Sequence, residues 1–427
     1  MTFDGKVNTL EDLMKLDSGF AFKSSEWVEI GTPVIKIRNV QDGFVDLNGC
    51  SFVSSETAKK ARGWYGEVGN TLIALTGAGV GEIGRIRENQ SGLINQRVGW
   101  VRPKNSDEED YIYYLLRYFK TEIIELASGS AQPNVSPKDI LRIPCKVPLK
   151  AERIAIGAVL SVLDEKISLN NGLSKTLEDI AQTIFKSWFI DFDPVKAKMA
   201  GEKPAGMDAA TAALFPDSMD ESELGLIPQG WSISKVGSLT KTFVGGTPSR
   251  AREDFWNGDI PWFNSGKVNE FRIIEASEYI TALGLQKSAA KLLPVGTTVL
   301  AITGATLGQY SRVEISASGT QNVIGILESE AISNEFIYSF IASGISRIVA
   351  AGTGGAQQHI NKDIVDNFEF IYPGKKLVDV FTSTVRSMFQ EISTLTFSSK
   401  NLSQLRDALL PRLISGELQI PKEMLAS

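Results

Sequence analysis

The sequence contains few of the residues from which metal centres and hydrolytic active sites are built. It has two cysteines, Cys50 and Cys145, and a single histidine, His359, in 427 residues. Two cysteines provide neither a disulfide framework nor a cysteine-rich metal cluster, which fits a reducing compartment. One histidine excludes a multi-histidine metal site and leaves one candidate base for a nucleophilic serine or cysteine. The composition therefore argues against hydrolytic and metal-dependent catalysis.

Long apolar runs and familiar phosphate-binding motifs are also missing. No stretch approaches the ~20 apolar residues of a membrane span, and the N-terminal MTFDGKVNTLEDL lacks the pattern of a signal peptide. We therefore expect a cytoplasmic protein without a membrane partner. No G-x-x-x-x-G-K-[ST] occurs, which excludes a P-loop. No Pro-Pro dipeptide occurs, which excludes the Asn/Asp-Pro-Pro-aromatic motif of amino-methylating DNA methyltransferases. These absences predict that the chain itself is not an enzyme.

The net charge is −6, which is unusual for a protein that binds DNA unaided. The acidic residues are unevenly distributed, however. Residues 191–225 carry eight acidic and three basic side chains, and residues 107–110 add four more acidic ones. The rest of the chain then has a balance of +3. Charge alone neither establishes nor excludes a nucleic-acid partner.

The chain contains an internal repeat with an offset of about 225 residues. GNTLIALTGAGVG from Gly69 resembles GTTVLAITGATLG from Gly296, and SGSAQPNVSPKDI from Ser128 resembles GTGGAQQHINKDI from Gly352. Solenoid repeats are 20–50 residues long and occur in several copies. Two copies of a unit this large instead predict two similar globular domains.

Each copy has the pattern of a mainly β domain with some helix. Glycine and asparagine separate short apolar runs, which is typical of strands joined by turns. The predicted strands are residues 33–40, 71–76 and 92–101 in the first copy, and 260–263, 298–303 and 320–327 in the second. A helix is predicted after them at residues 111–126 and 334–350.

A long helical segment follows each copy. Apolar residues recur at steps of three and four, as in a coiled-coil seam. In the first segment they are Val159, Leu163, Leu173, Leu177, Ile180 and Ile184, and in the second Val385, Met388, Ile392, Leu395, Leu402, Leu405 and Leu409. Asn170 and Ser399 occupy the weak seam positions. We predict two helices of ~35–40 residues that pair as an antiparallel coiled coil, the alternative being that each packs within one globular core. Residues 193–228, rich in Ala, Gly, Pro and acid, are predicted to be an exposed connector with one short helix near 208–214.

A glycine motif at the end of one predicted strand invites a different interpretation. Gly79, Gly81 and Gly84 match G-x-G-x-x-G, the dinucleotide-binding pattern. That pattern requires a helix to begin at the last glycine, but RIRENQSGLINQRVGWV follows, with strand and turn signals. In the second copy Gly79 and Gly84 are replaced by Thr306 and Ser311, whereas Gly77 and Gly81 persist as Gly304 and Gly308. A shared turn explains both copies better than cofactor binding does.

Amide, hydroxyl and basic side chains gather in the predicted loops of both copies. Arg can pair with guanine, and Asn or Gln with adenine, in the major groove of DNA, so these residue types could read base edges. For each residue the alternative is a loop or turn hydrogen bond. The candidates in the first copy are Lys36, Arg38, Asn39, Asn95, Gln96, Arg97, Gln132 and Asn134. Those in the second are Thr247, Ser249, Arg250, Asn264, Lys267, Gln321, Asn322, Gln357 and Gln358.

Five segments resemble the specificity subunits of type I restriction–modification systems. They are QTIFKSWFIDFDPVKAK (182–198), ALFPDSMDESELGLIPQGW (213–231), LRDALLPRLISGEL (405–418), VGGTPSRAREDFWNGDIPWFNSG (244–266) and LINQRVGWV (93–101). The resemblance implies an α+β fold, in which two mainly β or mixed target-recognition domains are separated by two long helices that pair as an antiparallel coiled coil. The expected division is a first recognition domain (1–150), a helical spacer (151–192), a connector (193–228), a second recognition domain (229–375) and a second spacer (376–420). The first domain begins with VNTLEDL and lacks the Gly-Trp opening of the second at Gly230 and Trp231.

The resemblance also implies the partners. Each recognition domain would read one half of a split, asymmetric sequence in double-stranded DNA. The spacers would hold two modification (methyltransferase) subunits, with which restriction/translocase subunits associate. S-adenosylmethionine, ATP and Mg²⁺ are expected on those partners, with no cofactor, metal or catalytic residue on this chain. Two alternatives remain at this point: a coiled-coil adaptor that binds other proteins, and a nucleotide-cofactor enzyme built on residues 79–84.

Overall fold

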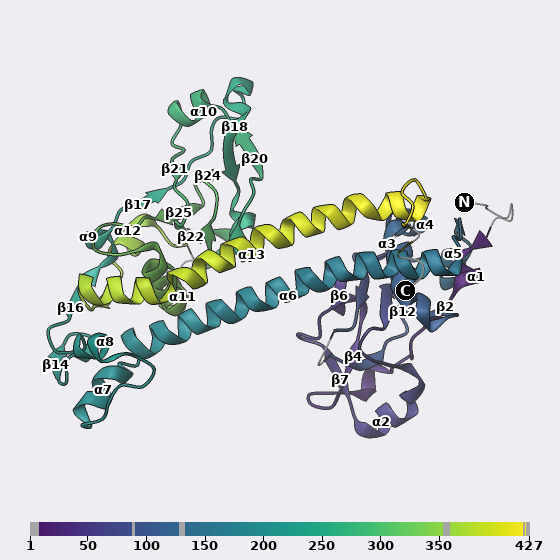
Figure 1. Ribbon diagram of the computed structural model, residues 1–427, viewed down its shortest axis with the longest axis horizontal. Helices are drawn as coiled ribbons and strands as arrows, with labels where there is room; N and C mark the ends of the chain where they lie inside the picture. Colours follow the sequence, from purple (N-terminus) through teal and green to yellow (C-terminus); the bar gives the residue numbers. More distant parts are fainter. Residues whose placement is uncertain (1–7, 88–89, 128–132, 353–358, 422, 424–427) are drawn as a thin grey trace. The chain divides into compact units, whose positions relative to one another are not determined.

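The chain folds into two compact units, each of which contains a β-rich domain and a part of both long helices (Figure 1). The computed structural model describes residues 8–87, 90–127, 133–352, 359–421 and 423. The first unit comprises Met1–Ile167 and Asn401–Ser427, and the second comprises Ser168–Lys400. We call their β-rich parts the first and the second domain.

Two sheets form the first domain. The six-stranded sheet has the order β2 (Met14–Ser18), β12 (Val98–Pro103), β9 (Thr71–Ala74), β10 (Ile83–Arg85), β6 (Gly43–Val45) and β5 (Val40–Gln41). The five-stranded sheet has the order β3 (Trp27–Val28), β7 (Ser51–Val53), β4 (Thr32–Ile35), β11 (Gly92–Ile94) and β8 (Tyr65–Gly66). The helices of this domain are α1 (Leu10–Leu13), α2 (Ser55–Lys60), α3 (Glu109–Tyr118), α4 (Lys120–Leu126) and α5 (Pro137–Leu141). A short pair, β1 (Asn8–Thr9) with β13 (Pro144–Cys145), closes the domain.

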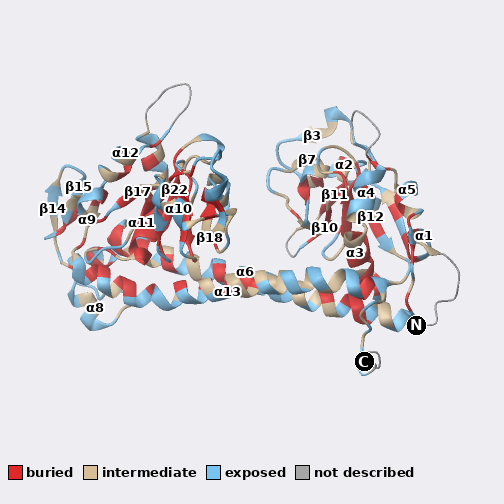
Figure 2. Ribbon diagram, turned by 90° about the horizontal axis from the view of Figure 1, so that it is seen from above, coloured by how far each residue is buried: buried red, intermediate tan, exposed pale blue. Residues whose placement is uncertain are grey.

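The second domain repeats this plan. Its five-stranded sheet has the order β17 (Thr242–Val244), β25 (Val323–Ile326), β22 (Thr298–Ala301), β23 (Tyr310–Val313) and β19 (Arg272–Ile273). Its four-stranded sheet has the order β20 (Glu278–Ile280), β18 (Trp256–Phe263), β24 (Ala317–Gly319) and β21 (Leu292–Leu293). The helices are α9 (Val236–Leu239), α10 (Ala282–Gln286), α11 (Asn334–Ala350) and α12 (Lys362–Asp366), and β16 (Ser232–Lys235) pairs with β26 (Glu369–Tyr372). Buried residues concentrate on α11 and β22 (Figure 2).

Backbone hydrogen bonds show that the two domains are structural repeats. Ala74 N–H donates to Glu82 O at 2.9 Å, and Ala301 N–H donates to Gln309 O at 2.8 Å. The N-terminal strands also correspond, because Leu10 N–H donates to Ile143 O and Val236 N–H to Phe368 O, both at 3.1 Å. Residues 8–13 (NTLEDL) are therefore the counterpart of the segment that precedes β17, although the first domain lacks the Gly-Trp opening.

The glycines of the apparent cofactor motif divide into two groups. Gly77 and Gly81 have φ of +81° and +85°, and their counterparts Gly304 and Gly308 have +69° and +81°. These are left-handed conformations, which glycine adopts most readily. After the turn the chain continues into strand β10, and a helix does not begin there. The prediction of a shared turn is confirmed, and residues 79–84 do not have the strand-turn-helix geometry of the dinucleotide-binding motif.

Three predicted elements are interrupted in the structure. Residues 92–101 form two strands in different sheets, β11 and β12, with a turn at residues 95–97 between them. The Asn95 side-chain Oδ1 accepts a hydrogen bond from Arg97 N–H at 3.2 Å, and such local bonds compete with strand ladders. Residues 33–40 likewise leave the sheet after Ile35 through a 3-10 turn, Ile37–Asn39. The predicted helix 111–126 is divided at Phe119 into α3 and α4.

The long helices are α6 (Lys150–Phe189, 40 residues) and α13 (Lys375–Ser415, 41 residues). In the second unit Asn170 contacts Ser398, while Phe185 contacts Phe381 with ring centroids 5.5 Å apart. A higher residue number on one helix is thus matched by a lower number on the other, which confirms antiparallel pairing. Among the described residues, no helix is both long enough and apolar enough to cross a membrane.

The contact between the helices changes in character along their length. In the first unit Ile156 and Leu160 of α6 share a core with Leu413 and Ile414 of α13. Near the middle several of the buried residues are polar, namely Asn170, Ser174 and Ser399, although Leu395 of α13 is buried there as well. Asn170 Nδ2 donates to Ser398 Oγ at 3.2 Å. Asn170 and Ser399 are both buried, as expected for seam positions, but Asn170 is bonded to Ser398 and not to Ser399. A buried polar contact of this kind is expected to favour one register at some cost in stability.

Some predicted seam positions face solvent instead. Leu173 is 47% exposed, Ile180 42% and Leu405 48%. Asn170, Ser174, Ala181 and Phe185 of α6 are buried instead and lie on an adjacent face, and Trp188 and Phe189 are buried at the end of the helix. The apolar face of α6 is wider than one partner helix can cover, and periodicity cannot tell which part of it is covered.

The segment between the copies is more ordered than an exposed connector. It forms α7 (Asp193–Met199), α8 (Ala209–Ala213) and a hairpin of β14 (Met219–Ser222) and β15 (Gly225–Pro228). Val195 and Phe215 are buried, and the Phe215 ring centroid lies 5.4 Å from that of Trp188 on α6. Val195 and Phe215 therefore belong to the core of the second unit.

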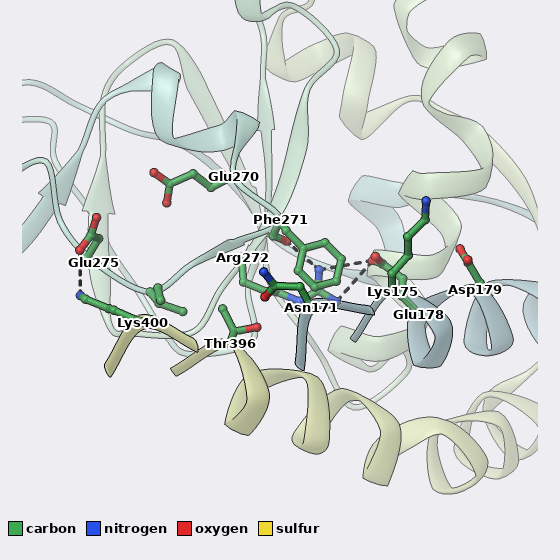
Figure 3. Close-up of a pocket in the computed structure, with 11 residues that line it drawn as sticks. Asn171, Lys175, Glu178, Asp179, Glu270, Phe271, Arg272, Glu275, Thr396 and Lys400 are labelled. Carbon is green, nitrogen blue, oxygen red and sulfur yellow. Dashed lines mark hydrogen bonds and ion pairs between the residues drawn. The ribbon is translucent and has the colours of Figure 1, made fainter. Parts of the chain in front are cut away.

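Ion pairs attach the second domain to both helices within its unit (Figure 3). Arg272 of β19 is fully buried and lies 3.3 Å from the Glu178 carboxylate of α6, and it donates to Tyr338 Oη of α11 at 3.0 Å. Glu275 is 2.8 Å from Lys400 of α13 and 2.8 Å from Lys267. The two attachment points flank a cavity of about 620 Å³ whose wall includes Phe271.

The glycine turn provides a matched pair of substitutions. We expect Gly81→Ala to lower the free energy of unfolding by about 1–2 kcal/mol, because alanine at positive φ is strained. The new Cβ would also lie 2.6 Å from Ile124 Cγ1. Gly79→Ala, whose Cβ would have Glu82 Cγ at 3.8 Å as its nearest neighbour, should change stability by less than ~0.5 kcal/mol. Denaturant unfolding of both variants measures the difference, and equal losses would refute the assignment of Gly81 to the turn.

The Glu275 attachment predicts a pH dependence. Hydrogen bonds from Lys267 and then Lys400 lower the pKa of the Glu275 carboxyl to about 2, from an ordinary value of 4.5. The stabilisation is fully present above the ordinary pKa and is lost as the pH falls toward 2. Glu275→Gln should therefore cost about 1 kcal/mol or less at pH 7, and its difference from wild type should narrow between pH 4.5 and pH 2. Urea unfolding across this range tests the prediction. The exposed Glu223→Gln is the control, and an unchanged Glu275→Gln difference at low pH would contradict it.

Candidate nucleic-acid interface

Strand ends gather several predicted site residues on one edge of the first domain. Asn95 N–H donates to Ile35 O at 3.0 Å, so Asn95 lies beside the end of β4, where Lys36 follows. Leu75 N–H donates to Arg97 O at 3.0 Å, and Val135 N–H donates to Leu75 O at 2.9 Å. These bonds bring together Lys36, Asn95, Gln96, Arg97 and Asn134. We call this the polar edge of the first domain.

The second domain has an equivalent polar edge. Thr320 N–H donates to Phe263 O and Ile302 N–H donates to Asn322 O, each at 3.0 Å. Asn264, Gln321 and Asn322 thus occupy the backbone positions that Lys36, Gln96 and Arg97 occupy in the first domain. Thr247 joins them, because its hydroxyl contacts Thr320 Oγ1 at 3.1 Å and donates to Gln321 Oε1.

Exposure separates possible contact residues from structural ones. Arg38, Gln96, Arg97 and Asn134 are exposed in the first domain, as are Ser249, Arg250, Asn264 and Gln321 in the second. Lys36, Asn95, Thr247 and Asn322 are partly exposed. Gln132, Gln357 and Gln358 lie outside the described residues.

Two of the predicted site residues use their side chains in hydrogen bonds or ion pairs within the domain. Asn39 is buried, and its side chain donates to Asp46 O at 2.8 Å and accepts from Lys36 N–H at 2.9 Å. It holds the loop and offers no surface to a ligand. Lys267 Nζ is paired with Glu270 at 2.7 Å and with Glu275 at 2.8 Å, so its charge is neutralised locally. Asn264 has a double role, since its Oδ1 also accepts from Gly266 N–H at 2.9 Å.

A cation lies over an indole ring near the polar edge of each domain. Lys36 Nζ is 3.7 Å from the Trp27 ring centroid and donates to Ser51 Oγ at 2.8 Å. Burial, with a smaller contribution from Arg38, lowers the pKa of the Lys36 amine. The guanidinium carbon of Arg250 is 3.6 Å from the Trp256 ring centroid. Neither tryptophan was among the predicted site residues. An aromatic residue close to a basic one in the sequence was the pattern that could have indicated them.

Further basic residues near the first polar edge were also missed. Gln96 N–H donates to Phe20 O at 2.9 Å, and the Phe20 ring centroid lies 5.4 Å from that of Trp64. Trp64 ends a 3-10 turn that begins with the exposed Arg62, and exposed Lys59 precedes it on α2. Their order in KKARGW, a basic cluster next to an aromatic residue, was the signal in the sequence.

Ion pairs account for much of the acidic charge of the first unit. Glu108 is 2.7 Å from Arg153 of α6, Asp107 is 3.1 Å from Lys150, and Asp110 is 2.6 Å from Arg85. The acidic run at residues 107–110 therefore lies against the helix. The polar edge is formed by other strands and carries no acidic residue among those named above.

The family comparison matches both copies. A family model described as "Type I restriction modification DNA specificity domain" matches residues 4–179 and 228–387. Each match includes one β-rich domain and part of the long helix that follows it. The internal repeat is thus a repeat of this family domain.

Curated relatives align over most of the chain. The type I restriction enzyme HindI specificity subunit of Haemophilus influenzae is 28% identical over 343 residues, which cover 70% of this chain and 74% of the relative. The MjaIX specificity subunit of Methanocaldococcus jannaschii is 26% identical over 335 residues, which cover 76% and 73%.

A solved structure has the same fold. The type I restriction–modification S subunit from M. genitalium aligns with a TM-score of 0.55 over 97% of this chain and 98% of that one, at 15% identity. Two family domains, two polar edges and an antiparallel helix pair are all present here. The chain belongs to the family of type I restriction–modification DNA specificity proteins.

Proposed function

We propose that this chain is the DNA-specificity subunit of a type I restriction–modification complex, in which it reads a split, asymmetric target. Its relatives bear the name of specificity subunits. The observation that carries the proposal is the pair of polar edges. Equivalent backbone positions present Lys36, Gln96 and Arg97 in one domain and Asn264, Gln321 and Asn322 in the other.

Different side chains on the same framework would read different bases. Arginine suits guanine and amides suit adenine in the major groove, so the two half-sites should differ in sequence. Strand ends also hold these side chains on a framework of backbone hydrogen bonds, which limits the entropy lost on binding. Two readers joined by helices would favour half-sites about one turn of DNA apart, 10–10.5 base pairs. We infer that the paired helices set the length of the unread gap.

The chemistry would reside on partner subunits. Methyl transfer requires S-adenosylmethionine, and DNA translocation and cleavage require ATP and Mg²⁺. We propose that two modification subunits and the associated restriction/translocase subunits bind these molecules, while this chain contributes no catalytic residue. The partners would also supply phosphate-binding surface, which fits the chain's own net charge of −6.

An exposed apolar row on α6 supports docking of a helical partner. Val162, Leu169, Leu173 and Ile180 are 61%, 68%, 47% and 42% exposed. Their spacings of seven, four and seven residues place them on one side of the helix, as in a coiled-coil seam. Exposed leucines in such a row leave apolar area in water that a second helix could bury. We propose that a modification subunit covers this row.

Sequence discrimination tests the proposed function. The chain purified with its modification subunits should bind one bipartite duplex, identified as the adenine-methylated motif of the source cell. At fixed salt concentration it should prefer this duplex over random duplex by at least ~10³-fold. Exchange of residues 1–150 for those of a relative should change one half-site and leave the other intact. Equal competition by random duplex would reject DNA specificity and favour the protein-binding adaptor.

The apolar row has its own test. Leu169→Glu combined with Leu173→Glu should weaken association with the modification subunits by roughly tenfold or more, because charges would be buried in an apolar contact. Lys175→Glu places the same charge on another face of α6 and is the matched control. Association is measured by sedimentation or calorimetry with purified subunits. Unchanged association of the double variant would place the docking site elsewhere.

A further inference from the structure

The two domains place a tryptophan at the same point of their smaller sheets. Trp27 of β3 is paired with Val53, and Trp256 of β18 is paired with Ile280. In both domains the paired residue immediately precedes a helix N-cap, Ser54 before α2 and Thr281 before α10. Each indole carries a cation on its face, but the cation differs in type and comes from a different part of the chain.

Arg250 of the second domain is held from several sides. Its guanidinium carbon lies 3.6 Å from the Trp256 ring centroid and 5.5 Å from that of Trp262. Its NH1 is 2.6 Å from the Glu278 carboxylate. The guanidinium therefore has one face against an indole and one edge against an acid, while the side chain remains 57% exposed.

The loop that carries Arg250 is itself fixed by the two indoles. Trp256 Nε1–H donates to Ser249 O at 3.2 Å, and Trp262 Nε1–H donates to Gly246 O at 3.0 Å. The ring centroids of the tryptophans lie 5.3 Å apart in an edge-to-face contact. Thr247, between the two fixed carbonyls, binds Gln321 of the polar edge. Arg250 thus belongs to the same framework as the polar edge of its domain.

The contacts of Arg250 with Trp256 and Glu278 add little to the stability of the fold. An exposed ion pair contributes little after the loss of side-chain entropy, and a cation–π contact at an exposed site contributes little more. The arrangement does restrict the guanidinium to one orientation. Such restriction is useful to a group that must donate two parallel hydrogen bonds, because the ordering cost is met before the ligand arrives.

We propose that Arg250 is a base-reading residue of the second domain and recognises a guanine, with Trp256 and Glu278 as its positioning residues. Arginine donates to guanine O6 and N7 in the major groove, which is a bidentate contact. Lys36, held on Trp27, is the corresponding reader in the first domain. The inference rests on the proposed function and extends it to particular residues.

A phosphate contact is the competing role for Arg250. A residue that binds phosphate lowers the affinity for every duplex when it is lost, and it reduces the salt dependence of binding. A residue that reads a base lowers the affinity for the cognate duplex and leaves the affinity for duplexes changed at that base pair nearly unaltered.

The experiment uses the chain assembled with its modification subunits and its cognate duplex. A competitor series changes each base pair of both half-sites in turn. For Arg250→Gln we expect discrimination at one G·C pair of the second half-site to fall by roughly 5- to 150-fold, with every position of the first half-site unaffected. Arg250→Lys keeps the charge but not the fork, and should lose the same discrimination with a smaller loss of total affinity. If the Arg250→Gln variant does not fold, the measurement on Arg250→Lys still tests the proposal.

Variants of the two positioning residues and of Lys36 in the first domain extend the test. Glu278→Gln and Trp256→Phe should reduce discrimination at that same G·C pair less than Arg250→Gln does. Lys36→Gln should relax one position of the first half-site and none of the second, so each domain controls for the other. Uniform weakening across all competitors by Arg250→Gln and Arg250→Lys would overturn the inference. Absence of sequence preference in the wild-type complex would instead refute the proposed function.

Discussion

The structure depends on the antiparallel contact between α6 and α13. Neither unit has a complete core without a part of each helix: Ile156 of α6 packs with Leu413 of α13 in the first, and Phe185 with Phe381 in the second. The first unit therefore needs residues from both ends of the chain, whereas the second is one contiguous segment, Ser168–Lys400, that includes parts of both helices. Aromatic and aliphatic residues supply most of the apolar burial toward the ends of the pair. Near the middle Asn170 is bonded to Ser398, and a buried polar contact of this kind favours one register at some cost in stability.

The same backbone framework presents different chemistry in the two domains. Positive-φ glycines form the turn after β9 and after β22, and equivalent hydrogen bonds then place the neighbouring turn on the polar edge. These bonds involve main-chain atoms, so they tolerate changes in the side chains that point outward. The exposed residues of the polar edge can therefore differ between the two domains without any change in the turn. Buried Asn39 and ion-paired Lys267 belong to the framework, although their residue types resemble those of readers.

Much of the fold could be predicted because it depends on local patterns. The repeat, the length of the two helices and the glycine turn all follow from short-range spacing and from backbone conformation. The exposed side of α6 could not be predicted, because Leu173 and Ile180 have the same periodicity as buried seam residues. Which part of an apolar face is covered depends on the position of α13, some 200 residues away in the sequence. The strand break at residues 95–97 was missed because β11 and β12 belong to different sheets, which depends on the strands they pair with far away in the sequence.

In the candidate site, too, some features follow from the sequence and others only from the tertiary structure. The sequence by itself determined which side chains with base-reading chemistry are present and that they occur twice, because residue type and internal repetition are properties of the chain. Only the tertiary structure decided that Lys36 and Arg97 lie on one edge, that Asn39 is buried, and that Arg250 rests on Trp256. Burial and stacking arise from residues that meet through the pairing of strands. Hydrogen bonds between strands bring distant residues within a few ångströms, and no local pattern in the sequence specifies which side chains then meet.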